Sequence, residues 1–245
     1  MMESDSNEQP APTPPEVPSE SIPGSRLVLA MGGIGVISGT LLVLTYLWTL
    51  PAIERNIAEA LQRSISDVLP GTRQTTTFAV ANQQLQPLGD EEDSLVKYYA
   101  GYDDAGQLIG VAVAAAGQGF QDTLSVLYGY SLDCQCIMGF KVMESKETPG
   151  LGDKIETDPD FTANFEALDV SLDSDMEQIL NPIVMVKHGQ KTEPWQIDAI
   201  TGATISSQAV ANILHDSSAV SAPLINKNRQ VLNNGNSSDD IADTD

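Results

Sequence analysis

The chain has 245 residues, and its 12 lysines and arginines against 34 aspartates and glutamates give a formal charge of −22 and a pI near 4.1. This acidity argues against nucleic acid as a partner, because binding to a phosphate backbone depends on lysine and arginine. Two cysteines imply neither a disulfide framework nor a cysteine-ligated iron–sulfur cluster.

The chain begins with two segments of opposite composition. Residues 1–25 are rich in proline, serine and glutamate and are predicted to be a disordered acidic tail, because they cannot bury a core. Residues 26–50 are an almost unbroken apolar run. As a helix at about 1.5 Å per residue this run reaches roughly 36 Å, enough to span a bilayer. A cleaved signal peptide is the alternative, but the run is long for one and follows an acidic region.

Residues 51–70 are predicted to form a stalk helix that continues from the membrane anchor. Their apolar side chains recur at helical spacing, and a Pro-Gly pair ends the segment. The positive charges on the two sides of the anchor give only a weak indication of which side faces the cytoplasm. Arg26 lies on one side and Arg55 and Arg63 lie on the other, which slightly favours the C-terminal side as cytoplasmic.

Residues 71–225 are predicted to form the main domain, and residues 226–245 a second disordered acidic tail. Residues 75–80 are predicted to be an edge strand. Two β-hairpins are expected after it, because strand-like runs are joined by short polar turns. They pair residues 95–102 with 108–114 and residues 122–130 with 135–143.

Cys134 and Cys136 are predicted to lie near the start of the last of these strands, where both thiols would face one side. With no further cysteine, and with His188 and His215 distant in sequence, they are interpreted as small packing residues, and no metal site is predicted. A redox or metal-ligand role is the alternative.

A glycine-rich loop follows the second hairpin. Its residues 147–152 read Glu-Thr-Pro-Gly-Leu-Gly, and Asp153 is a candidate helix cap after them. Taken alone, the pattern is typical of a strand-to-helix turn. A helix that contains Phe161, Phe165 and Leu168 is expected next.

A second motif, Asp198-Ala-Ile-Thr-Gly-Ala-Thr-Ile-Ser-Ser, follows a strand-like run at residues 183–187 and a polar turn. It opens a predicted helix, because apolar residues recur at helical spacing from position 205. Asp198 and Thr201 are candidate N-caps. The first turn of a helix offers a phosphate its free amides and the positive end of the dipole. Gly202 and Ala203 leave room for a ligand beside the Thr204 hydroxyl, although an ordinary capped helix has the same pattern.

This second motif resembles the flavin-attachment motif of FMN-binding domains. In that family FMN is joined by a phosphoester bond to the last threonine of a Ser/Thr-Gly-Ala-Thr core, and Thr204 is the matching residue. Residues 147–152 resemble the second signature of the same family, a loop that lies beside the flavin. Two motifs in the family's order are far more specific than either one alone.

The resemblance spans residues 95 to 214 approximately, and the anchor and stalk make the layout similar to the G subunits of Rnf-type electron transport complexes. It implies an α+β fold, in which a single N-terminal transmembrane helix precedes an extracytoplasmic FMN-binding domain with an antiparallel sheet and packed helices. It also implies covalent FMN on Thr204. The further cofactor-binding candidates are Thr201, Gly202, Ala203, Ser206, Asp198, Glu147, Thr148 and Leu151; no catalytic residue is expected.

The function implied by the resemblance is that of an electron carrier without substrate turnover of its own. The complex would couple electron transfer between ferredoxin and NAD to ion translocation across a bacterial inner membrane, with a single-pass anchor and the flavin domain on the periplasmic side. The implied partners are the other subunits and a flavin transferase that uses FAD and Mg²⁺. Alternatives are the C subunit of a Na⁺-translocating NADH:quinone reductase, a membrane-anchored regulatory FMN protein and a non-redox anchored binding module.

Overall fold

The computed structural model describes residues 23–81, 84–88 and 96–235. The chain divides into two compact units, Met1–Asn56 and Ile57–Asp245. Most of the predicted N-terminal tail, residues 1–22, lies outside the described residues, as does the end of the predicted C-terminal tail, residues 236–245.

Helix α1 (Gly24–Val68) contains both the predicted anchor and the predicted stalk in one continuous helix of 45 residues. Pro51 lies inside it, although proline lacks the N–H that an interior position donates. By length and composition, α1 is the one helix among the described residues that suffices to cross a membrane. Gly71, with φ of +95°, follows its end, as the Pro-Gly pair predicts.

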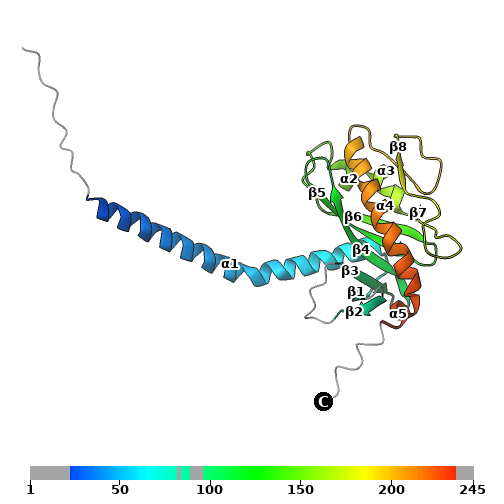
Figure 1. Cartoon of the computed structure of the whole chain (residues 1–245), viewed down its shortest axis with the longest axis horizontal. Helices are drawn as coiled ribbons and strands as arrows, with labels where there is room; N and C mark the ends of the chain where they lie inside the picture. The colour runs from blue at the N-terminus through cyan, green and yellow to red at the C-terminus, as the bar shows by residue number, and fades with distance from the viewer. Residues whose placement is uncertain (1–22, 82–83, 89–95, 236–245) are drawn as a thin grey trace, which may run out of the picture. The chain divides into compact units, whose positions relative to one another are not determined.

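A seven-stranded antiparallel sheet forms the centre of the second unit, in the order β2-β1-β3-β4-β5-β6-β7 (Figure 1). Both predicted hairpins are confirmed, as β3–β4 and β5–β6. The prediction of an edge strand at residues 75–80 is wrong, because a short polar strand, β2, pairs outside β1. The strands are β1 (Gln74–Ala81), β2 (Gln84–Pro87), β3 (Lys97–Tyr102), β4 (Leu108–Gln118), β5 (Thr123–Ser131), β6 (Cys136–Glu144) and β7 (Leu168–Asp169).

The two faces of the sheet bury different partners, because successive side chains of a strand alternate between faces. Tyr98, Val113 and Tyr128 belong to the main core, which includes buried residues of helix α4 (Thr204–Lys227). Figure 1 shows α4 lying across the sheet.

The opposite face holds Ala112 and Leu127, which pack with Ile65 and Val68 at the C-terminal end of α1. Gly129 allows this approach, because a Cβ atom at this position would overlap the backbone oxygen of Val68.

Three short elements replace the single helix expected around Phe161. Helices α2 (Lys154–Thr157) and α3 (Pro159–Thr162) and the 3₁₀ turn η1 (Ala163–Phe165) precede β7. Pro159 explains the break, because proline cannot continue a helix but is well suited to begin one. Asp153 is the N-cap residue of α2, as predicted, but its side chain makes no capping bond; Asp158 caps α3 by accepting from two backbone amides.

A small parallel pair, β8 (Val184–Val186) and β9 (Gln196–Asp198), leads into α4. The strand-like run at residues 183–187 predicts β8, whereas β9 was not predicted, because three residues are too few to show a period. Asn164 supports β9: its side chain accepts from the backbone N of Asp198 at 3.0 Å and donates to the backbone O of Asp198 at 3.3 Å.

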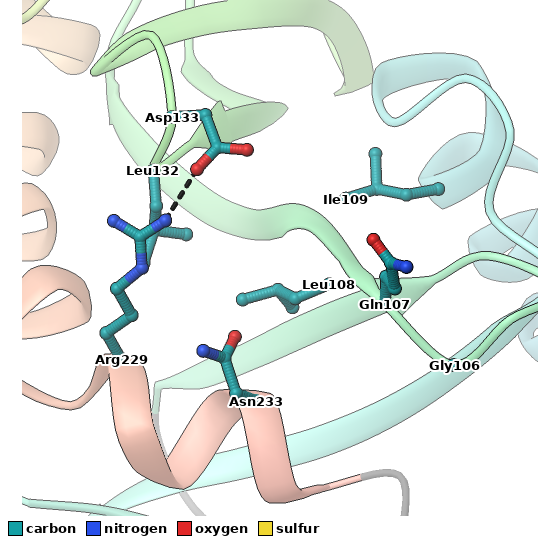
Figure 2. A pocket seen from close by; sticks show the side chains of 8 residues that line it. All are labelled: Gly106, Gln107, Leu108, Ile109, Leu132, Asp133, Arg229 and Asn233. Carbon is teal, nitrogen blue, oxygen red and sulfur yellow. Dashed lines mark hydrogen bonds and ion pairs between the residues drawn. The ribbon is translucent and has the colours of Figure 1, made fainter.

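The prediction of a disordered tail from residue 226 is wrong for residues 226–235. Helix α4 continues to Lys227, and helix α5 (Arg229–Asn234) follows it. Leu232 is fully buried, and its backbone oxygen accepts from Tyr102 Oη at 2.6 Å. Figure 2 shows Arg229 of α5 pointing toward Asp133. Their side chains form an ion pair at 2.5 Å, and both line a cavity of about 330 Å³. One buried leucine in a polar segment was too weak a signal to predict this helix.

The two cysteines form a disulfide, so their interpretation as small packing residues is wrong. Cys134 lies in the turn between β5 and β6 rather than on a strand, and Gln135 between them has a left-handed φ of 50°. This turn brings the two Cα atoms to 5.2 Å, within the range that a disulfide spans.

Candidate functional site

The two sequence motifs meet at a cavity of about 340 Å³. The loop after β6 forms one side, and the turn that begins α4 forms the other. Seven of the nine candidate residues line the cavity together with Phe120, Gly152 and Ile205. The seven are Glu147, Thr148, Leu151, Gly202, Ala203, Thr204 and Ser206.

Glu147 connects three segments around this cavity. Its carboxylate is buried, accepts from the backbone N of Phe120 at 2.7 Å and accepts from Ser206 Oγ at 2.7 Å. Hydrogen bonds to a carboxylate are about twice as strong as those between neutral groups. Glu147 therefore holds the loop after β4 and the first turn of α4 against its own loop.

Gly152 allows the glycine-rich loop to lie close to Glu147. A Cβ atom at Gly152 would lie 2.6 Å from Glu147 Oε2 and 2.9 Å from Ser206 Oγ. The amide N atoms of Leu151 and Gly152 both donate to the backbone oxygen of Thr148, at 3.1 and 3.0 Å, which makes the loop a tight turn.

An exposed ion pair joins the same segments at the surface. Lys146 Nζ lies 2.6 Å from Asp122 Oδ2. The hydrogen bond from Lys146 lowers the pKa of the Asp122 carboxyl, and the same contact raises the pKa of Lys146.

The turn before α4 presents Thr204 at the cavity. Gly202 has φ of +89°, a left-handed conformation that glycine adopts without strain. Ser207 stabilises the turn, because its Oγ accepts from the backbone N of Ile200 at 3.2 Å and donates to the backbone O of Ala203 at 2.9 Å. Thr204 is exposed and is the first residue of the helix, where backbone amides have no helical carbonyl to pair with.

The prediction that Asp198 or Thr201 caps this helix is wrong. Ala203 is the N-cap residue of α4, and its side chain makes no capping bond. Asp198 and Thr201 line a neighbouring hollow of about 240 Å³. There the Asp198 carboxylate accepts from the backbone N of Gly189 at 2.9 Å and from that of Gln190 at 3.3 Å. The Asp198 carboxylate therefore binds the polar turn after β8 and not the first turn of α4, where the prediction placed it.

Apolar side chains form an exposed rim around the cavity. Phe120, Leu151 and Ile205 are 56%, 52% and 59% exposed. Exposed apolar side chains grouped around a hollow are typical of a ligand site. Sequence reasoning missed Phe120 and Ile205; the signal that could have found Phe120 is a bulky aromatic inside a glycine-containing turn.

The comparisons with known proteins agree with this geometry. Residues 119–218 match the family model of the FMN-binding domain. The G subunit of an ion-translocating oxidoreductase complex from Methanosarcina acetivorans is 34% identical over 197 residues, which cover 80% of this chain and 94% of that one. The corresponding protein from Cereibacter sphaeroides is 31% identical over 152 residues, covering 61% and 67%.

Two further proteins extend the comparison. The G subunit of the Na⁺-translocating ferredoxin:NAD⁺ oxidoreductase complex from Acetobacterium woodii is 28% identical over 195 residues, covering 76% of this chain and 86% of that one. The crystal structure of Shewanella oneidensis NqrC aligns with a TM-score of 0.52 at 18% identity, covering 74% and 97%, and shows the same α+β fold. The chain belongs to the family of G subunits of ion-translocating oxidoreductase complexes.

Proposed function

We propose that this chain carries FMN joined by a phosphoester bond to Thr204 and passes electrons within an Rnf-type complex. The complex couples electron transfer between ferredoxin and NAD to ion movement across the membrane. One observation carries the proposal: the exposed Thr204 begins a helix at the cavity where the two family motifs meet. The name of the Acetobacterium relative supports the choice of ferredoxin and NAD.

The residues at the cavity fit a group that has both a phosphate and a flat apolar ring. The free amides of the first turn of α4 and the positive end of its dipole stabilise a phosphate on Thr204. A Cβ atom at Gly202 would meet nothing within 4 Å, so the space beside Thr204 is open. Phe120, Leu151 and Ile205 offer exposed apolar surface to a ring.

Each side chain then has a distinct task in the proposal. FMN, when bound, supplies the redox chemistry. Leu151 excludes water from the ring, and Thr148 orders the loop, because its Oγ accepts from Gln121 Nε2 at 2.7 Å. Glu147 positions Ser206 and hence the first turn of α4. Asp198, in the neighbouring hollow, is accessible to the transferase that attaches FMN from FAD with Mg²⁺.

We further propose that α1 anchors the chain as a single span in the inner membrane, with the FMN-binding domain on the periplasmic side. The apolar side chains of α1 from Leu27 to Trp48 are exposed, as a lipid-facing helix requires. The disulfide between Cys134 and Cys136 supports the periplasmic side, because disulfides persist in oxidising compartments. We give the disulfide more weight than Arg55 and Arg63, whose positive charges slightly favour the cytoplasmic side for the same domain.

The mass of the intact protein tests the attachment. The chain, co-expressed with an active flavin transferase, is expected to gain the mass of one FMN less one water, located on the peptide that holds Thr204. The denatured band is expected to fluoresce. An unmodified mass and a dark band, with a transferase active on another target, would contradict the proposal.

A further inference from the structure

The disulfide between Cys134 and Cys136 closes a ring that contains one further residue, Gln135. A disulfide stabilises a fold mainly by restricting the unfolded chain, and this effect grows with the length of the loop that the disulfide closes. Because these cysteines are only two positions apart, their disulfide restricts the unfolded chain far less than one that closes a long loop. Stabilisation of the fold is therefore a poor explanation for this disulfide.

The two cysteines differ in their exposure to solvent. Cys134 is exposed, whereas Cys136 begins β6 and is only 7% exposed. A thiolate breaks a disulfide by attacking one of its two sulfur atoms, and the rate depends on access to that atom. Exposed disulfides are also the more easily reduced ones. The fold therefore presents Cys134 to an incoming thiolate and shields Cys136.

Gln135 connects the disulfide to the segment after β7. Its backbone O accepts from the backbone N of Val170 at 3.0 Å, and its Oε1 accepts from the backbone N of Leu172 at 3.0 Å. Its Nε2 donates to Met176 Sδ at 3.6 Å. Gln135 makes these bonds from a left-handed φ of 50°, which a residue other than glycine rarely adopts. Breaking the disulfide removes a covalent constraint on this conformation and so weakens the bonds to residues 170–176.

We propose that Cys134 and Cys136 form a site of reversible thiol–disulfide exchange with a protein that carries a dithiol. A thiolate of the partner attacks Cys134 Sγ, the bond between the two Sγ atoms breaks, and Cys136 leaves as a thiolate that takes up a proton. The second thiol of the partner then attacks the partner's own sulfur in the mixed disulfide and releases Cys134, which takes up the second proton. Two electrons and two protons pass to this chain, and the partner is left with a disulfide.

Reduction loosens one segment without unfolding the domain. Leu168 and Val170 are fully buried, so the core still holds β7 when the disulfide is open. The amide of Leu172 depends instead on the side chain of Gln135, and this bond is the one that reduction weakens most. The disulfide is therefore a local redox switch. Neither FMN nor another subunit takes part in the exchange, so it is independent of the proposed function.

The rate of reduction in the folded chain tests the exchange. The full chain in detergent is treated with dithiothreitol, either folded or in urea above its unfolding midpoint, and its free thiols are counted by alkylation and intact mass. The rate constant of the folded chain is expected to lie within about a hundredfold of that in urea, because Cys134 is exposed. A purely structural disulfide is reduced only after unfolding, so a larger difference between the two rate constants would overturn the proposal.

Two matched variants test which sulfur is attacked. Cys136→Ser retains only the Cys134 thiol, and Cys134→Ser retains only the Cys136 thiol. Iodoacetamide is expected to alkylate Cys134 at least tenfold faster than Cys136 in the folded chains, and both at similar rates in urea. Equal rates in the folded chains, or a faster Cys136, would overturn the assignment of Cys134. The reduction of the wild type by dithiothreitol needs neither variant and stands if one of them fails to fold.

Hydrogen–deuterium exchange measures the switch itself. The amide of Leu172 is expected to exchange at least fivefold faster in the reduced wild type than in the disulfide form, while residues 124–128 of β5 exchange equally in both. Equal exchange at Leu172 in the two forms would show that reduction leaves the segment in place and would overturn the switch. Faster exchange throughout β5 would show that reduction unfolds the domain, which would also overturn it.

Discussion

Thr201 and Thr204 are three residues apart in one motif, yet they lie in different hollows. The hollow of Thr204 has an apolar rim, whereas that of Thr201 is lined by charged and titratable side chains, among them Lys154, His188 and Asp198. The left-handed turn at Gly202 separates the two. A contiguous motif is therefore not a single site: Thr204 lines the hollow with the apolar rim, and Thr201 lines the charged one.

The largest expected effect separates the two threonines. Thr204→Val should abolish covalent FMN, because the variant lacks the oxygen that forms the ester. Thr201→Val should retain it, because Thr201 lines the neighbouring hollow and not the cavity that Thr204 lines. Intact mass after co-expression with the transferase measures both.

Thermal unfolding serves as the control for this pair, since both threonines are exposed and neither substitution should change the melting temperature appreciably. FMN on the Thr204→Val chain, or an equal loss from both variants, would remove the distinction between the hollows.

A carboxylate in each hollow gives the next comparison. Glu147→Ala should lower the free energy of unfolding by about 3 kcal/mol, because it leaves the Phe120 amide and the Ser206 hydroxyl without their buried acceptor. Asp198→Ala should cost about 1 kcal/mol, because its partners are amides of an exposed turn. Urea denaturation measures the two values, and similar values would show that Glu147 does not hold the cavity together.

Local regularity in the sequence predicted much of the fold. The β3–β4 and β5–β6 hairpins followed from alternating side chains and polar turns, and the helix from Thr204 followed from its apolar spacing. Neither the three-residue β9 nor α5, with its single buried Leu232, offers enough residues for a period to emerge. Both depend on contacts with residues far away in the chain.

The candidate site was less predictable than the strands and helices, because local patterns in the sequence do not show which distant residues meet. Glu147 and Thr204 are far apart in sequence, and only the resemblance to FMN-binding domains placed them together. No spacing rule could place Asp198 away from α4, because the left-handed turn at Gly202 and the bonds from Gly189 and Gln190 arise in the folded chain. The disulfide was missed because Cys134 was assigned to a strand instead of a turn.

Two glycines of the loop after β6, Gly150 and Gly152, allow a finer test of how this loop packs beside the cavity lined by Thr204. Gly152→Ala should cost about 2 kcal/mol, because its Cβ atom would lie against Glu147 and Ser206, which hold each other in place. Gly150→Ala should cost about 1 kcal/mol from its φ of +78° alone, since nothing lies within 4 Å of the new atom.

The double variant Glu147→Ala/Gly152→Ala distinguishes crowding from backbone strain. The Gly152→Ala cost should shrink when Glu147 is already truncated, because the closest neighbour is then gone. Strict additivity of the two costs in urea denaturation would contradict the close packing of the loop on Glu147.

The smallest expected effect is a pH dependence of folding stability that arises from Lys191, which lies near Asp198. Lys191 Nζ donates to Asn164 Oδ1 at 3.1 Å, and partial desolvation of the ammonium lowers the pKa of Lys191 below its ordinary 10.5. Between the lowered native pKa and 10.5 the native state therefore binds fewer protons than the unfolded state. This contribution to stability is complete above pH 10.5 and is lost as the pH falls through the native pKa.

The variant Lys191→Met isolates this contribution. The stability of the wild type minus that of the variant should rise with pH up to about 10.5. Tyrosines such as Tyr102, whose pKa burial raises to about 12, titrate in both proteins and cancel in the difference. Urea denaturation between about pH 8 and 11 measures it. A difference that falls with pH would mean that the Asp198 carboxylate, rather than desolvation, controls Lys191, and that the charged hollow favours a cation.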